Sequence, residues 1–276
     1  MARMLVPREG LFGNGEPAIT WLGQAGFWID TGQHRILIDP YLSDSLAKKY
    51  DGQLNDHKRM APPPVLPTDL PEPDLVLITH AHTDHMDPET LGPLTERFPE
   101  VQLVVPLATV ALARERTGGR GQITAVSDGV SVEPLQGLKI DVLPAAHETL
   151  ERDGDGNGVF LGYGINSAGL SIYHSGDCVP FEGLDPLVKE LDAAVALLPV
   201  NGRDETRRQA GIPGNFHISE AMELCESTGI PTMVPHHFGM FAFNTIEESV
   251  IDEAATSTSR PQIVKPVLGQ RLVLRG

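Results

Sequence analysis

The densest group of chemically competent side chains lies between residues 80 and 85. Within six positions the sequence carries His80, His82, Asp84 and His85. Neutral imidazole and carboxylate are the usual protein ligands of zinc, manganese and iron. In an extended segment, side chains alternate between two faces, which would put His80, His82 and Asp84 on one side. His85 would then require a turn, so the spacing predicts two metal ions with two of these ligands each.

The elements around this group indicate that it ends a buried strand. Residues 75–78 read Leu-Val-Leu-Ile, a short apolar run typical of a strand covered on both faces. A helix is expected over 88–98, followed by a strand over 101–105. The alternative, a polar loop with chance histidines, does not account for four ligand-type residues so close together.

Three further candidate ligands follow other predicted strands. His147 comes after the strand 138–143 and could be the third ligand of the ion held by His80 and His82. Asp177 could bridge two ions with its two oxygens. Of the adjacent pair His236 and His237 only one should reach a metal, because neighbouring side chains diverge, and we choose His237. Taken alone, a histidine such as His147 is more often a surface residue than a ligand, and the alternative for Asp177 is a turn residue.

Candidate substrate contacts lie in loops. The connection over residues 40–73 contains His57, Lys58 and Arg59, which could clamp an anionic group or form a solvated basic patch. Asn201 follows the predicted strand 192–200. His217 precedes a predicted helix over 219–227, where it could cap the helix or face a pocket.

A family resemblance rests on the metal-ligand segment. Residues 79–85, Thr-His-Ala-His-Thr-Asp-His, resemble the H-x-H-x-D-H signature of the metallo-β-lactamase fold superfamily. The resemblance implies an α/β fold, a four-layer αββα sandwich with its metals at one edge between two sheets. The alternation of predicted strands and helices over residues 101–126 agrees with an α/β layer. No linker divides the chain, so we expect a single domain over residues 1–276.

The resemblance also implies a division of the ligands. It places one ion on His80, His82 and His147 and the other on Asp84, His85 and His237, with Asp177 shared between them. It further places Asp39 beneath the metals as a support and not as a ligand, although the sequence alone is equally compatible with a turn residue there.

Shorter matches resemble the branch that contains L-ascorbate-6-phosphate lactonase. They are Trp21-Leu22-Gly23, Arg59-Met60-Ala61, Leu77-Ile78-Thr79-His80, Tyr173-His174-Ser175-Gly176-Asp177 and Pro235-His236-His237.

These observations favour a metal-dependent hydrolase, with a lactonase as the specific hypothesis. A metal-bound hydroxide would open a small, anionic or sugar-derived lactone, and Asp84 would orient the nucleophile or accept its proton. The expected cofactors are two divalent ions, zinc or manganese, with iron also compatible. The alternatives are hydrolysis of a small phosphodiester and a non-catalytic metal-binding or sensor protein.

Composition limits the partners. The formal net charge of −16 argues against nucleic acid and anionic membranes, whereas bound metals would still permit a small anionic substrate. We expect a cytoplasmic protein that acts on a small molecule. The chain has only two cysteines, no apolar leader and no run of about 18 apolar residues. A homo-oligomer is compatible with the sequence.

Overall fold

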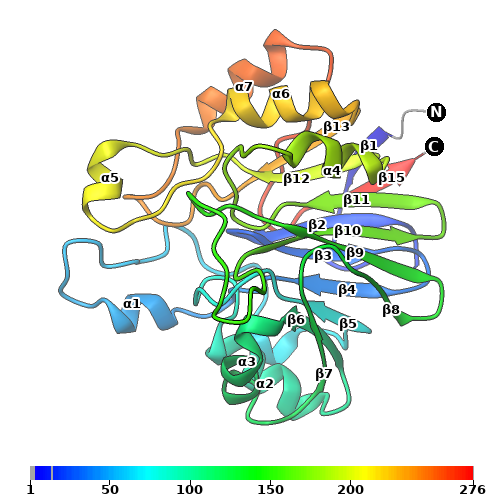
Figure 1. The fold of residues 1–276 in the computed structure, drawn as a ribbon, viewed down its shortest axis with the longest axis vertical. Helices are drawn as coiled ribbons and strands as arrows, with labels where there is room; N and C mark the ends of the chain where they lie inside the picture. Colours follow the sequence, from blue (N-terminus) through cyan, green and yellow to red (C-terminus); the bar gives the residue numbers. More distant parts are fainter. Residues whose placement is uncertain (1–3, 14, 276) are drawn as a thin grey trace.

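Two mixed β-sheets lie at the centre of the structure, a computed structural model that describes residues 4–13 and 15–275 (Figure 1). The first sheet has the strand order β1-β15-β2-β3-β4-β5-β6-β7. Its strands are β1 (Met4–Arg8), β2 (Ala18–Gly23), β3 (Gly26–Asp30), β4 (Arg35–Ile38), β5 (Leu75–Leu77), β6 (Gln102–Pro106), β7 (Gln122–Val126) and β15 (Arg271–Arg275). The strands from β4 to β7 are parallel and the others antiparallel.

The second sheet repeats this plan with the order β14-β13-β12-β11-β10-β9-β8. Its strands are β8 (Ser131–Leu135), β9 (Leu138–Pro144), β10 (Leu161–Ser167), β11 (Leu170–His174), β12 (Val195–Pro199), β13 (Thr232–His236) and β14 (Gln262–Ile263). The strands from β11 to β14 are parallel. Each sheet therefore has a parallel part, in which the ends of neighbouring strands meet at one edge.

Alternation of side chains along the first sheet creates two separate apolar clusters. On β3, Phe27 and Ile29 belong to the large core that also contains the second sheet, whereas Trp28 belongs to a cluster on the outer face. On β5, Leu75 and Leu77 face the same way as Phe27, and Val76 faces outward. Period-two geometry thus buries both faces of this sheet.

Helices cover the two outer faces. The first sheet is covered by α2 (Pro88–Arg97) and α3 (Val110–Arg116), and the second by α4 (Leu184–Glu190), α6 (Ile218–Thr228) and α7 (Glu248–Ser257) (Figure 1). The expected αββα sandwich is confirmed. Two short helices, α1 (Ser45–Lys49) and α5 (Glu205–Gln209), lie among the loops at one end of the molecule.

The sequence located most of the central elements and missed several peripheral ones. The connection over residues 40–73 was expected to be a long loop, but it contains α1 and the 3₁₀ turn Pro67–Asp69. The helical segment between β6 and β7 begins as a 3₁₀ turn, Leu107–Thr109, and becomes α-helical only in α3. β15 was not predicted, because its place between β1 and β2 depends on contacts that are distant in sequence.

No helix in the described ranges combines the length and apolar character needed to cross a bilayer.

Tyr163 ties the second sheet to the segment that leads into the predicted ligands. Its buried hydroxyl donates a hydrogen bond of 2.7 Å to the carbonyl of Ile78. We expect Tyr163→Phe to lower the free energy of unfolding by about 1–2 kcal/mol, because the carbonyl loses its partner in a dry environment. Urea denaturation measures this change. Tyr50→Phe is the control, since no described residue hydrogen-bonds to the Tyr50 hydroxyl, and equal effects of the two substitutions would contradict the expectation.

Candidate metal centre

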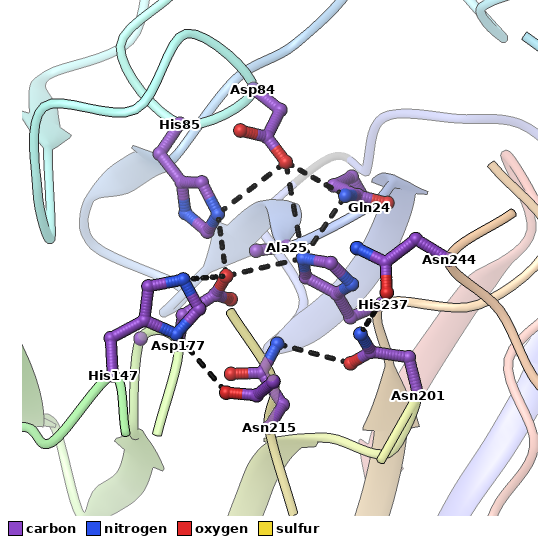
Figure 2. Close-up of polar contacts among 12 residues, drawn as sticks. Gln24, Ala25, Asp84, His85, His147, Asp177, Asn201, Asn215, His237 and Asn244 are labelled. Carbon is purple, nitrogen blue, oxygen red and sulfur yellow. Dashed lines mark hydrogen bonds and ion pairs between the residues drawn. The ribbon is translucent and has the colours of Figure 1, made fainter. Parts of the chain in front are cut away.

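Four loops at the ends of strands bring the seven predicted ligands together. His80, His82, Asp84 and His85 follow β5, and the other three follow β9, β11 and β13. Figure 2 shows Asp84, His85, His147, Asp177 and His237 pointing toward one another. The site therefore lies at the edge where the ends of strands from both sheets meet.

A turn, and not an extended chain, presents the ligands that follow β5. The chain bends over residues 81–86, and the amides of His85 and Met86 donate to the carbonyl of His82 at 3.1 and 2.8 Å. The simple alternation considered from the sequence therefore does not apply to Asp84. The turn passes directly into α2, where Asp87 accepts a hydrogen bond from the amide of Glu89 as N-cap.

Gly176 allows Asp177 to reach the centre. Its φ is +62°, and a Cβ at this position would lie 2.5 Å from the carbonyl oxygen of Leu161. Only glycine fits both the backbone conformation and the space. The close approach of these two segments places Asp177 between the histidines.

Asp177 occupies the middle of the cluster. Its Oδ2 lies 3.2 Å from His237 Nε2, 3.4 Å from His85 Nε2 and 3.6 Å from His147 Nε2. The potential ligand atoms form three groups, each with its atoms within 4.8 Å of one another: His80, His82 and His147; His80, His85 and Asp177; and Asp84, His85 and His237. The first and third groups are the two sets that the family resemblance implies, and Asp177 belongs to the group that links them.

Several buried polar atoms of this cluster have no hydrogen-bond partner among the described residues, as expected for a site that binds metal ions. His80 Nε2, His85 Nε2 and Asp177 Oδ1 are buried and have no hydrogen-bond partner among the described residues. Burying such atoms without a partner is costly, and a bound cation would satisfy all three. The residues present therefore fit divalent metal ions.

Hydrogen bonds at the opposite ring nitrogens fix the direction of the ligands. His85 Nδ1 donates to Asp39 Oδ2 at 2.7 Å, and His147 Nδ1 donates to the carbonyl of Gly214 at 3.2 Å. Such contacts orient metal-binding histidines and select the tautomer that leaves Nε2 free to coordinate.

Asp39 lies beneath the cluster, as the resemblance implies. It is fully buried, and its Oδ1 accepts from the amide of Thr79 at 2.8 Å while its Oδ2 accepts from the Thr79 hydroxyl at 2.5 Å. With the bond from His85, Asp39 joins the end of β4 to the start of the ligand segment. Asp39 thus holds the predicted ligand segment through hydrogen bonds, and it belongs to none of the three groups of potential ligand atoms.

Burial and charge act in opposite directions on the ligands. Burial lowers the pKa of His147 to about 4 and keeps its imidazole neutral. Burial also opposes charge on His85, but Asp177, Asp39 and Asp84 outweigh it and raise the pKa of His85 well above its ordinary value. Burial would raise the pKa of Asp177, yet His237 and His85 lower it well below its usual range.

Gln24 is a neighbour of the cluster that the sequence did not single out. Its Nε2 donates to Asp84 Oδ2 at 2.8 Å and lies 3.0 Å from His237 Nε2 (Figure 2). Its backbone carbonyl accepts from the backbone amide of His237 at 3.0 Å. Gln24 occupies the turn between β2 and β3 with a positive φ of 51°. Nothing in the sequence indicated that this side chain would reach across to another loop.

A cavity of about 580 Å³ opens beside the cluster. His82, Asp84, His147, Asp177 and His237 line it. Among the predicted substrate contacts, His57 also lines it. The His57 ring stacks on Tyr50 with centroids 4.3 Å apart, and its Nδ1 lies 2.7 Å from the carbonyl oxygen of Asn55.

The structure does not bring Lys58 and Arg59 to this cavity. Lys58 Nζ pairs with Asp56 at 2.7 Å on the surface. Arg59 Nε donates to the carbonyl of Ala61 at 3.1 Å, and Arg59 Nη1 donates to the carbonyl of Tyr41 at 3.0 Å. The guanidinium therefore binds backbone carbonyls. Adjacent positions in the sequence suggested a common clamp, but tertiary partners turn these two side chains elsewhere.

Asn201 and His217 also lie outside the cavity lining. Asn201 is buried, donates to Asn244 Oδ1 at 2.7 Å and accepts from Asn215 Nδ2 at 3.0 Å (Figure 2). Asn244 lines the cavity, so Asn201 reaches it only through this neighbour. His217 is the N-cap of α6, and its amide donates to Glu220 Oε2 at 2.8 Å.

Comparison with known proteins assigns the family. A profile described as "Beta-lactamase superfamily domain" matches residues 34–238, a range that contains all seven predicted ligands. The chain belongs to the metallo-β-lactamase superfamily. A UPF0173 metal-dependent hydrolase of Methanoculleus marisnigri is 31% identical over 228 residues, which cover 81% of each chain. The protein is thus a member of a family of metal-dependent hydrolases.

Solved structures share the fold of this superfamily member. Igni18, a metallo hydrolase from Ignicoccus hospitalis, has a TM-score of 0.69 at 22% identity and covers 94% of this chain and 98% of its own. An isothiocyanate hydrolase from Delia radicum gut bacteria has a TM-score of 0.74 at 18% identity, covering 92% and 97%. At these identities the similarity concerns the fold alone.

Replacing Asp39 tests its supporting role. We expect Asp39→Asn to lower the affinity for zinc about 10- to 100-fold, because His85 loses the carboxylate that orients it. Competition with a chromogenic chelator measures the affinity. Asp74→Asn is the matched control, since Asp74 pairs with Arg35 away from the centre. An unchanged affinity in Asp39→Asn would show that His85 is oriented without this carboxylate.

Metal binding should release a proton from His85. Its raised pKa means that the ring is protonated near neutral pH without a metal, whereas His147, with a pKa of about 4, is already neutral. We therefore expect zinc affinity to increase with pH, by up to about tenfold per pH unit for each proton displaced. Calorimetric titration in buffers with different ionisation enthalpies counts the protons. Binding without proton release at neutral pH would contradict this account.

Proposed function

We propose that this chain hydrolyses a small carbonyl ester, with a lactone as the simplest form, at a pair of divalent metal ions. The observation that supports the proposal is the convergence of unpaired, buried ligand atoms beside a cavity of about 580 Å³. A cavity of this size suits a small molecule.

The ligands would divide between two ions. His80, His82 and His147 would hold one, Asp84, His85 and His237 the other, and Asp177 would be shared. Mixed imidazole and carboxylate ligands suit zinc or manganese, and iron is also compatible. Bound in such a site, divalent ions supply a water of lowered pKa and polarise a carbonyl oxygen.

Asp84 is suited to handle the proton of the attacking water. It lines the cavity, and 17% of its side-chain surface is exposed to solvent. Burial would raise its pKa, but His85 and His237 lower it, so the carboxylate is ionised at neutral pH. Gln24 Nε2 donates a hydrogen bond of 2.8 Å to Asp84 Oδ2 and thereby fixes the orientation of the carboxylate. An ionised, fixed carboxylate at the cavity surface can orient water and accept its proton.

The choice of a lactone rests on the resemblance to L-ascorbate-6-phosphate lactonase. Part of that resemblance lies around Arg59, whose guanidinium donates hydrogen bonds to backbone carbonyls and does not line the cavity. The proposal therefore concerns the bond that is cleaved, and it does not extend to phosphate recognition by Lys58 or Arg59.

Activity and metal content together test this function. We expect zinc- or manganese-loaded protein to open simple lactones, and Asp177→Asn to lower kcat/KM at least about a hundredfold with loss of bound metal. A lactone panel and a small aryl phosphodiester are assayed side by side, with elemental analysis of each sample. Asp155→Asn, in an exposed turn, is the control.

Three outcomes would overturn the proposal. Turnover of the phosphodiester without turnover of any lactone would indicate a phosphodiesterase. Bound metal with no turnover of either would indicate a binding or sensor protein. Equal lactone turnover by the metal-free protein would exclude the metal site as the catalytic centre.

A further inference from the structure

We infer that the substrate carries an anionic oxygen group, carboxylate or phosphate, next to a flat apolar group, and that Arg116 and Lys49 bind the anion. The inference rests on the proposed hydrolysis at the same cavity and names the substrate class. It assigns anion binding to residues other than Lys58 and Arg59.

The charges that line the cavity differ from those of the whole protein. The chain carries a formal charge of −16, yet the only carboxylates among the described residues that line the cavity are Asp84 and Asp177, both in the metal-ligand cluster. Lys49 and Arg116 supply two cations. With two divalent ions the local sum is about +4, which would concentrate anions inside an otherwise acidic molecule.

Arg116 is held in place with hydrogen-bond donors to spare. Its Nη1 donates to the carbonyls of Ala81 at 2.7 Å and Met86 at 2.8 Å, which fixes the partly buried side chain against the turn that carries His82 and Asp84. No described carboxylate forms an ion pair with it. A guanidinium has five N–H groups, so Nε and Nη2 remain for an anion beside the ligand turn.

Other arginines of the described chain show the contrast. Arg203 and Arg208 each place two nitrogens on one carboxylate, that of Glu220 and that of Glu205 respectively. Their charges are neutralised locally. Arg116 instead keeps its charge at the cavity surface.

Lys49 is the second positively charged residue that lines the cavity, and we expect it to bind an anion more weakly than Arg116 does. It is exposed near the C-terminal end of α1, and its Nζ lies 5.1 Å from the centre of the Tyr50 ring. No described residue pairs with it, whereas the neighbouring Lys48 pairs with Glu89 at 2.6 Å. An exposed ammonium contributes less than a fixed guanidinium and is screened by salt.

Four flat rings form an aromatic wall of the same cavity: Tyr50, His57, Phe241 and Phe243. Phe241 and Phe243 stack with centroids 5.9 Å apart and an interplanar angle of 10°. The His57 ring is T-shaped to both, with centroid distances of 5.1 Å to Phe241 and 4.6 Å to Phe243. Such a wall suits a planar apolar group, because stacking adds to the favourable burial of its surface.

Backbone pairing keeps the aromatic wall together. Arg59 forms an isolated bridge with Phe241, and the amide of Met60 donates to the carbonyl of Met240 at 2.9 Å. Two segments distant in sequence therefore present their rings to one cavity. The anionic group and the flat group would occupy different parts of it.

Binding of non-reactive probes tests the inference independently of turnover. Calorimetric titration of the full chain, metal-free and zinc-loaded, uses benzoate and phenyl phosphate as anions and benzamide as the neutral analogue. We expect Arg116→Gln to weaken binding of an anion about 10- to 100-fold and to change benzamide binding less than about threefold. The two anions distinguish a carboxylate from a phosphate site.

Arg114→Gln is the matched control, because Arg114 is exposed on the same helix and does not line the cavity. It should leave every probe unaffected. Lys49→Gln should weaken anion binding only about two- to fivefold, and added salt should remove the difference. Phe243→Leu should weaken benzoate but leave cyclohexanecarboxylate unchanged, since only the planar ring can stack.

Turnover supplies the second readout. With 4-acetoxybenzoate and its neutral methyl ester, we expect wild type to prefer the anion and Arg116→Gln to lose that preference with unchanged zinc content. If neither ester nor any lactone reacts, the proposed hydrolysis fails, while the probe titrations still decide the anion site.

Two results would overturn the inference. The first is wild-type protein that binds benzoate, phenyl phosphate and benzamide equally. The second is an Arg116→Gln protein that loses anionic and neutral probes alike, which would mean that Arg116 only holds the ligand turn. Arg116→Lys guards against a folding defect: it keeps the charge but has fewer donors, so it should retain part of the preference for anions.

Discussion

The cost of burying unpaired polar atoms is the constraint on which the rest of the structure depends. Asp177 has three imidazole nitrogens within 3.6 Å of one oxygen, in a region with little access to water. Such a group is stable only if its charges compensate one another or a cation compensates them. The surrounding contacts, especially those of Asp39 and Gly176, hold these atoms at positions that a cation can satisfy.

The structure separates the reacting centre from the surfaces that would select a substrate. The predicted ligands follow strands of two sheets that share one large core, so buried strands set their positions. The aromatic wall and Lys49 come from a helix of five residues and from loops. Changes in these loops would therefore alter the cavity wall without displacing the predicted ligands.

Sequence alone could predict the parts that depend on local chemistry. The residue types and spacing from His80 to His85 predicted a metal site, and short apolar runs predicted most of the central strands. Gln24 and Arg116 could not be found in this way, because their partners at the centre are set by chain packing. Lys58 and Arg59 show the reverse case: three adjacent basic residues suggested a clamp, yet Asp56 and the Tyr41 carbonyl bind them away from the cavity.

The position of β15 has a consequence for the order of folding during synthesis. All seven predicted ligands are translated before residues 271–275, but those residues form the strand between β1 and β2 in the first sheet. Until they emerge from the ribosome, the edge of β2 that pairs with β15 has unpaired backbone groups. The first sheet is therefore completed only after every strand of the second sheet has been translated, and a growing chain depends on β15 to close an edge that could otherwise pair with another polypeptide.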